Sequence, residues 1–211
     1  MKALAQAQQL TLDLLPAVLK AARAEMHYFK AGVQVTAKSD DSPVTAADHE
    51  AEAIVLECLA RVAPDVPVVA EERAAAGQLP SPKGRFFLVD ALDGTRYFIR
   101  GKPEFSVNVA LIEDTAPVYG LIYVPPTGRL YFTGGDGYAY SAVVPCESDA
   151  PAGIDPMHLK RIVTRAPDRS NLMAYTSRNS AGASGEFLRA LQVHESRSLG
   201  SSEKFCLIAS G

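Results

Sequence analysis

Residues 86–95 read Phe-Phe-Leu-Val-Asp-Ala-Leu-Asp-Gly-Thr, and this stretch decides the fold that we expect. The four apolar residues at its start are too few for a helix and predict a buried strand. The strand ends at Asp90, and a second carboxylate, Asp93, follows three residues later. Gly94 allows the backbone to turn, and Thr95 is a favoured N-cap residue. We therefore expect a strand, a turn and a helix, with two carboxylates at their junction.

This arrangement suits metal and phosphate chemistry. Carboxylates are good ligands for a hard divalent cation, and the N–H groups at a helix start suit a phosphate. Two alternatives stay open. A plain loop, in which Asp caps a helix and Gly makes the turn, would show the same letters. Aspartyl-phosphate phosphatases carry Asp-x-Asp-Gly-Thr, in which the first Asp is a nucleophile and the second a general acid. Here Asp90 and Asp93 are three apart, which favours metal ligation.

A second predicted strand also ends in acids. The apolar run 66–70 predicts a short strand, and Glu71-Glu72 follows it directly. In open α/β sheets, ligands collect at the carboxyl ends of the strands. Two adjacent glutamates are usually only solvent-exposed charges. Two predicted strands that both end in acids are less easily explained by chance. We therefore expect Glu71 to lie close to Asp90 and Asp93.

Two long helices are predicted before these strands. Apolar residues recur at helical spacing over 4–31, where Pro16 predicts a kink or two separate helices. Thr45 and Asp48 match a capping box, which opens a predicted helix of about 18 residues. By itself Asp48 is a helix cap, and only the motif at 90–95 gives it a further role.

The rest of the chain predicts a meander and then alternating strands and helices. Extended runs over 105–144, joined by short Pro- and Gly-containing connections, predict antiparallel strands. The polar, turn-rich segment 145–156 suggests a boundary, so we expect an N-terminal α+β domain over 1–144 and an α/β domain over 145–211. Gly200-Ser201-Ser202 opens a predicted helix that carries Lys204. This helix start is a second candidate anion site, with an ordinary Ser N-cap as the alternative.

Composition bounds the class of protein. The chain has 211 residues, of which 47% are hydrophobic and 21% charged, as in a globular protein of one large or two small domains. There are 24 acidic and 21 basic residues, so we expect no nucleic-acid polymer as a partner. Cys58, Cys146 and Cys206 form no Cys-x-x-Cys pair, which favours a reducing compartment. Asp13 and Pro16 interrupt the leading apolar run, so we expect no export signal and a cytoplasmic protein.

Taken together, the motifs resemble the lithium-sensitive, magnesium-dependent phosphomonoesterases, the superfamily of inositol monophosphatase and fructose-1,6-bisphosphatase. Two of the matching motifs, Gly-Ser-Ser-Glu-Lys-Phe-Cys and the Ser-Pro before Val-Thr, favour the CysQ group of bacterial 3'(2'),5'-bisphosphate nucleotidases. The resemblance implies an α/β (α+β) fold, a layered αβαβα sandwich whose C-terminal part is incomplete here. In the family's order, the matching segments are 42–48 (Ser-Pro-Val-Thr-Ala-Ala-Asp), Glu71-Glu72, 89–95 (Val-Asp-Ala-Leu-Asp-Gly-Thr), 105–113 (Phe-Ser-Val-Asn-Val-Ala-Leu-Ile-Glu) and 200–206.

The resemblance also implies roles for single residues. Glu71, Asp90 and the backbone carbonyl of Leu92 would hold one Mg²⁺. Asp90 and Asp93 would share a second ion, and Glu71 would help with a third, so that the site takes two to three ions. The Thr95 hydroxyl, oriented by Asp48, would activate the attacking water. The implied catalytic residues are Asp48, Glu71 and Thr95, and the implied substrate-binding residues are Asp93, Gly94, Thr95, Ser201, Ser202 and Lys204.

By resemblance, the reaction is Mg²⁺-dependent hydrolysis of 3'-phosphoadenosine 5'-phosphate to AMP and phosphate by a metal-activated water. Inositol phosphate or another sugar phosphate is the alternative substrate. An inactive phosphate- or metal-binding module, or an interaction protein on the same scaffold, is the alternative of a different class. The expected partner is thus a small phosphorylated molecule. A homodimer could form through the N-terminal helices and the meander, and the sequence does not test for peripheral membrane association.

Three features depart from the family pattern. Asp90 is followed by Ala91 where the family has Pro, which should be harmless because the ligand at Leu92 is a carbonyl. Nucleotidases often carry Ser-Arg-Ser-His where this chain has Ser-Arg-Asn-Ser at 177–180, so one nucleotide contact is missing. The family's last metal ligand, the Asp of a Trp-Asp pair, would lie beyond Gly211, and the chain contains no Trp. We expect either a shortened chain or a second metal site that lacks one carboxylate.

Overall fold

The computed structural model describes residues 2–32, 35–37, 43–81, 84–148, 159–177 and 183–211. Ser42 of the first family motif, residues 178–180 of the Ser-Arg-Asn-Ser segment and most of the predicted boundary 145–156 lie outside these ranges. The predicted division into domains at residue 144 stays a prediction. Strand β9, which follows that position in the chain, pairs with β8 at the edge of the large sheet.

One mixed sheet of seven strands organises the molecule. Its first pair, β3 and β4, is parallel, and every later pair in the sheet is antiparallel. The predicted meander over 105–144 is therefore confirmed. In spatial order, the strands are β3 (Val68–Ala70), β4 (Arg85–Asp93), β5 (Ser106–Glu113), β6 (Ala116–Val124), β7 (Arg129–Thr133), β8 (Ala139–Val143) and β9 (Lys160–Ile162).

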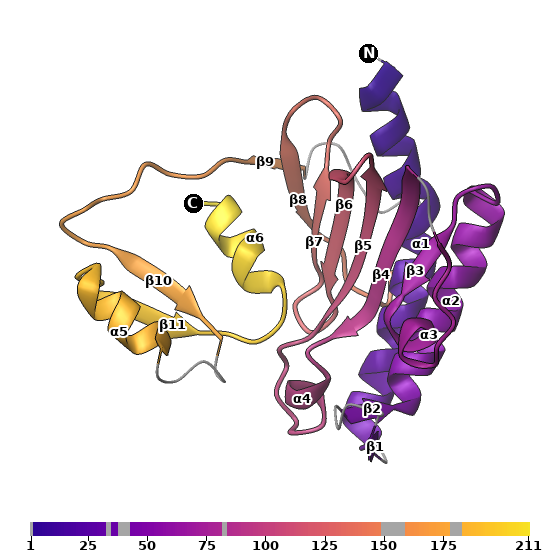
Figure 1. Cartoon of the computed structure of the whole chain (residues 1–211), viewed down its shortest axis with the longest axis horizontal. Helices are drawn as coiled ribbons and strands as arrows, with labels where there is room; N and C mark the ends of the chain where they lie inside the picture. Colours follow the sequence, from indigo (N-terminus) through magenta and orange to yellow (C-terminus); the bar gives the residue numbers. More distant parts are fainter. Residues whose placement is uncertain (1, 33–34, 38–42, 82–83, 149–158, 178–182) are drawn as a thin grey trace.

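Helices cover the sheet in layers (Figure 1). Helices α1 (Lys2–Ala31) and α2 (Ala46–Val62) lie against one face of the sheet, and α6 (Glu203–Ala209) lies on the other side. Beyond α6 come the parallel strands β10 (Met173–Thr176) and β11 (Glu195–Ser198) with α5 (Ala183–Ala190). This order of layers agrees with the predicted α/β sandwich. The remaining elements are β1 (Val35–Ala37) paired with β2 (Pro43–Thr45), α3 (Glu71–Ala75) and α4 (Thr95–Phe98).

Helix α1 is one helix and not two. Pro16 lies inside it, on the exposed side. Proline removes one backbone hydrogen bond, and water can satisfy the carbonyl group that is left on this side. None of the helices in the described ranges combines the length and apolarity needed to cross a membrane.

The main core lies between α1, α2 and one face of the sheet. Side chains alternate along a strand, so Phe87, Val89 and Ala91 of β4 face this core. Phe87 and Val89 are 1% and 4% exposed. Asp90 lies between two of these core residues in sequence and therefore points to the opposite face. The alternation separates the apolar core from the side of the sheet on which the acidic residues gather.

One acidic residue is buried in this apolar layer. Glu25 of α1 is completely buried, and neither of its carboxyl oxygens has a hydrogen-bond partner within the described part of the chain. Burial raises the pKa of Glu25 well above its usual value, and the charges of Asp48 and Asp90 raise it further. Glu25 therefore loses its proton less readily in the folded protein than in the unfolded chain.

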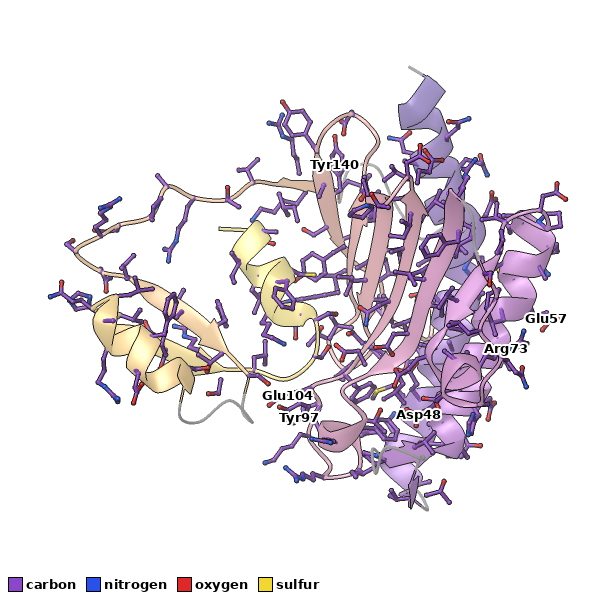
Figure 2. All side chains as sticks on the ribbon, viewed as in Figure 1. Asp48, Glu57, Arg73, Tyr97, Glu104 and Tyr140 are labelled. Atoms are coloured by element: carbon purple, nitrogen blue, oxygen red, sulfur yellow. The ribbon has the colours of Figure 1, made fainter. Side chains whose placement is uncertain are left out.

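We expect Glu25→Gln to stabilise the fold more at about pH 8 than at about pH 5. Because the folded-state pKa is raised, the acid's contribution to stability is complete below its unfolded-state pKa and is lost as the pH rises. The difference in unfolding free energy between variant and parent should change by at most about 1.4 kcal/mol per pH unit. Urea unfolding in EDTA measures it, with Glu57→Gln, an exposed position on α2 (Figure 2), as the control. A difference that does not depend on pH would contradict this expectation.

Candidate active site

Glu71 and Asp90 meet because β3 and β4 run parallel. Ala70, the last residue of β3, pairs with Val89, so the two strands run toward the same end of the sheet. Glu71 follows β3 directly, and its carboxyl group is hydrogen bonded to that of Asp90. Two carboxyl groups can form such a bond only when one of them holds a proton. The structure therefore brings together the acids of the two predicted strands.

A β-bulge places Asp93 beside them. Asp90 pairs with Asn108 of β5, and Asp93 pairs with Ser106, so three steps along β4 match two steps along β5. Without the bulge, residues three apart would face opposite sides of the sheet. With it, Asp90 and Asp93 come to one side. The prediction that the strand ends at Asp90 was wrong, because β4 continues through the bulge to Asp93. The spacing of three that separated this motif from the Asp-x-Asp phosphatases is accommodated in the strand itself.

The carboxyl groups of Asp90 and Asp93 lie in a largely buried part of the site. Burial, followed by the charges of Glu71 and Asp93, raises the pKa of Asp90. Burial also raises the pKa of Asp93, although hydrogen bonds from the Ser201 side chain and the Ser202 backbone, and the charge of Lys204, oppose this. Such crowding of like charges is typical of functional sites.

The donor chemistry fits a hard cation. The buried Oδ1 atom of Asp90 has no hydrogen-bond partner among the residues that the structure describes. In those residues, no group of three or more His, Cys, Asp or Glu side chains is arranged to hold a metal ion as it stands. Because the pKa of Asp90 is raised, an ion that binds here would compete with a proton on Asp90. The oxygen donors available are the carboxylates of Glu71, Asp90 and Asp93 and the carbonyl of Leu92, the kind of set that Mg²⁺ takes.

Thr95 and Asp48 form a directed hydrogen-bond chain. The Thr95 Oγ1 donates to Asp48 Oδ1 at 2.9 Å and also approaches the Leu92 carbonyl at 3.2 Å. Asp48 is 2% exposed, and its Oδ2 accepts from both the backbone N–H and the hydroxyl of Thr45. The predicted capping box is confirmed, since it is present at the start of α2. When the Thr95 hydroxyl donates its one proton to Asp48, its oxygen is free to accept a hydrogen bond from a water.

Gly94, and not Thr95, is the N-cap of α4, so the prediction of Thr95 as the cap was wrong. Gly94 has a φ of 103°, which favours glycine. Its carbonyl accepts hydrogen bonds from the Tyr97 and Phe98 N–H groups, while the Thr95 hydroxyl is engaged with Asp48. A Cβ atom at Gly94 would lie 2.5 Å from the Glu104 carbonyl oxygen, so any larger residue would displace the turn.

Sequence reasoning missed Glu52. Its carboxylate accepts hydrogen bonds from the backbone N–H groups of Glu72 (2.7 Å) and Arg73 (3.1 Å), at the start of α3. This capping holds the segment that carries Glu71. The signal in the sequence was the spacing of four between Asp48 and Glu52, which places both acids on one face of α2. Ser106, Asn108 and Glu104 were missed as well, because their contacts are with residues far along the chain.

A pocket of about 260 Å³ joins these parts. It contains residues from both ends of the chain, among them Arg96 of α4 and Ser177, which follows β10. Asp48, Asp90, Leu92 and Ser202 lie around the pocket through the contacts given above. The predicted site residues that line the pocket are Glu71, Asp93, Gly94, Thr95, Ser201 and Lys204.

A sequence model of the inositol monophosphatase family matches residues 4–211. The chain belongs to the inositol monophosphatase family. Among curated relatives, a 3'(2'),5'-bisphosphate nucleotidase CysQ of Salmonella typhimurium is 36% identical over 174 residues, covering 82% of this chain and 65% of that protein. The protein of the same name from Escherichia coli K12 is 37% identical over 180 residues, covering 85% and 67%. The chain thus spans about two thirds of the length of these relatives.

Solved structures of family members share the fold. CysQ from Bacteroides thetaiotaomicron superimposes with a TM-score of 0.70 at 28% identity, over 97% of this chain and 77% of that one. The extragenic suppressor protein suhB from Bartonella henselae gives a TM-score of 0.74 at 24% identity, over 96% and 75%. The predicted α/β fold of the inositol monophosphatase type is confirmed.

We expect Mg²⁺ to bind more tightly as the pH rises from about 6 to about 8, because a proton must leave the Glu71–Asp90 pair first. Affinity should increase by up to about tenfold per pH unit for each proton released. Isothermal titration in buffers of different ionisation enthalpy counts the protons. Asp90→Asn should weaken binding and remove most of its pH dependence, whereas Glu57→Gln should change neither. Binding that releases no proton at any pH would show that the carboxyl pair is not the site.

Proposed function

We propose that the protein is a Mg²⁺-dependent phosphomonoesterase that hydrolyses a small phosphorylated substrate by direct attack of water. The observation that carries the proposal is the hydrogen bond from the Thr95 hydroxyl to Asp48, because Thr95 lines the same pocket as Glu71 and Asp93. The family membership of the chain supports the reaction class.

Each residue has a part in the proposed reaction. Bound at Glu71, Asp90, Asp93 and the Leu92 carbonyl, two to three Mg²⁺ ions would neutralise phosphate charge and acidify a water molecule. The Thr95 oxygen would accept a hydrogen bond from the attacking water and so orient its lone pair toward phosphorus. Asp48, fixed by the Thr45 hydrogen bonds, would hold the Thr95 hydroxyl in this orientation. The backbone N–H groups of Gly94 and Thr95 would bind oxygens of the reacting phosphate.

We propose 3'-phosphoadenosine 5'-phosphate as the substrate, with AMP and phosphate as products. Relatives at 36% and 37% identity are named 3'(2'),5'-bisphosphate nucleotidases. Lys204, Ser201 and Arg96 reach the same pocket as Thr95, and a second, non-reacting phosphate would need such donors and cations. An inositol or other sugar phosphate is the second candidate. It is supported by the match of the chain to the inositol monophosphatase family model.

The proposal also covers the cellular location and the oligomeric state of the enzyme. A cytoplasmic location is supported by Cys58, Cys146 and Cys206, which are free and buried. A homodimer through α1, α2 or the edge of the meander is part of the proposal, to be measured by sedimentation.

The substrate is tested by phosphate release from 3'-phosphoadenosine 5'-phosphate and from inositol 1-phosphate, in Mg²⁺, in EDTA, and in Mg²⁺ with Li⁺. We expect kcat/KM at least about tenfold higher for the bisphosphate, which corresponds to about 1.4 kcal/mol of discrimination, and no release in EDTA. The reverse preference would favour the sugar-phosphate alternative. Binding of both compounds without release from either would identify an inactive phosphate-binding module.

Thr95→Val should lower kcat by about 100-fold or more, since it removes the group that orients the water. Thr95→Ser keeps a hydroxyl and should retain most of the activity. Mg²⁺ affinity should stay within about twofold in both variants, because neither removes a carboxylate ligand. Direct attack by water also predicts that no phosphate becomes attached to the protein. A phospho-aspartate trapped at Asp90 by acid quench would overturn the mechanism.

A further inference from the structure

The turn before α6 is hydrogen bonded to a single row of side chains on and beside β5. The Gly200 N–H donates to Glu104 Oε2 at 2.6 Å. The Ser106 hydroxyl is within hydrogen-bond distance of the hydroxyls of both Ser201 and Ser202. The Ser202 hydroxyl donates to Asn108 Oδ1 at 2.7 Å. We call Glu104, Ser106 and Asn108 the docking row.

The docking row has the spacing of one strand face. Its members are two residues apart, so their side chains point to the same side of the extended chain. Val107 and Val109, on the opposite side, are buried in the main core. Core packing therefore fixes the positions of Ser106 and Asn108, whereas Glu104 lies just before the start of β5.

The fit between the turn and the row is close. A Cβ atom at Gly200 would lie 2.5 Å from the Tyr97 ring and 3.0 Å from Glu104 Oε2, so only glycine fits. Figure 2 shows Tyr97 and Glu104 near each other at the α4 end of the sheet. Ser201 has a φ of 60°, a left-handed conformation that is strained for a residue other than glycine. The hydrogen bonds to the docking row offset this strain and hold the turn in place.

The docked turn delivers three groups to the pocket. The Ser201 side chain and the Ser202 backbone hydrogen bond to Asp93, and the Lys204 Nζ donates to the Ser201 carbonyl. Ser201 and Lys204 both line the pocket, whereas Glu104 does not. Asn108 lines a neighbouring cavity of about 460 Å³ together with Glu71, Asp90 and Ser202. Glu104 therefore lies behind the groups that would meet a ligand.

We propose that the docking row positions Ser201 and Lys204, and thereby sets the affinity of the site for the part of the substrate that carries the second, non-reacting phosphate. Glu104 is a positioning residue in this proposal, since it acts through the Gly200 N–H and touches no reacting atom. The proposal rests on the proposed function for the identity of the ligand. The geometry of the docked turn does not depend on that function.

The test compares a substrate that has the second phosphate with one that lacks it. Steady-state kinetics are measured for 3'-phosphoadenosine 5'-phosphate and adenosine 3'-monophosphate. Glu104→Ala should raise KM for the bisphosphate about tenfold, the loss expected for a hydrogen bond to a charged group. The kcat for the bisphosphate, and kcat/KM for the monophosphate, should stay within about twofold. Gly200→Ala, which forces the turn away from Tyr97, should show the same selective loss.

Two further variants serve as controls. Glu104→Gln keeps an oxygen acceptor for the Gly200 N–H and should restore the parent KM for the bisphosphate. Glu113→Ala removes an acid from the far end of β5, where it pairs with Arg85 on the surface, and should change nothing at the site. Equal losses for both substrates, or no loss for either, in Glu104→Ala and Gly200→Ala would overturn the proposal.

Hydrogen exchange of the segment 199–206 separates this proposal from the proposed function. Exchange there should be faster in Glu104→Ala than in the parent and unchanged in Glu113→Ala. If the parent protein releases phosphate from neither nucleotide, the proposed nucleotidase function is wrong. Hydrogen exchange then tests by itself whether the docking row holds the segment 199–206 in place. Equal protection of the segment in Glu104→Ala and the parent would then refute it.

Discussion

Two short strands that run in the same direction hold the candidate site together. Strand β4 has nine residues, so its two ends lie about 25–30 Å apart. Had β3 paired with β4 in the antiparallel sense, Glu71 would leave the sheet at the far end from Asp90. The parallel pairing instead brings the carboxyl groups into hydrogen-bond contact. The rest of the site is built around this crowding of acids.

Helix α2 links the two halves of the site. Asp48 reaches forward to the Thr95 hydroxyl, and Glu52, one turn later, caps the helix that begins at Glu71. Both acids are almost completely buried, and each has its oxygens satisfied by N–H or O–H donors, which offsets the cost of burying them. A shift of α2 would therefore move the proposed water-orienting group and a proposed metal ligand together.

The two faces of strand β5 make different kinds of contact. One of its faces belongs to the main core, and the other carries the hydrogen bonds to the turn at 200–202. The turn lies about a hundred residues further along the chain, and its Ser201 lines the same pocket as Thr95. The C-terminal part of the chain is thus fixed to the site by polar contacts at the end of the sheet, and α6 packs with Val124, Tyr131 and Ile162 through Cys206.

Local pattern determined much of the secondary structure of this protein. The strand that begins the stretch 86–95, the capping box of Thr45 and Asp48 and the meander could be predicted because periodicity, turn residues and caps act within a few residues of the chain. The same reasoning placed Glu71 near Asp90, since the acids follow strand ends. Only the tertiary structure decided the bulge that brings Asp93 to the side of Asp90, the engagement of Thr95 with Asp48 that leaves the cap to Gly94, and the burial of Glu25. These features depend on which strands pair, in which register, and on which helix covers them, and no short window of sequence contains that information.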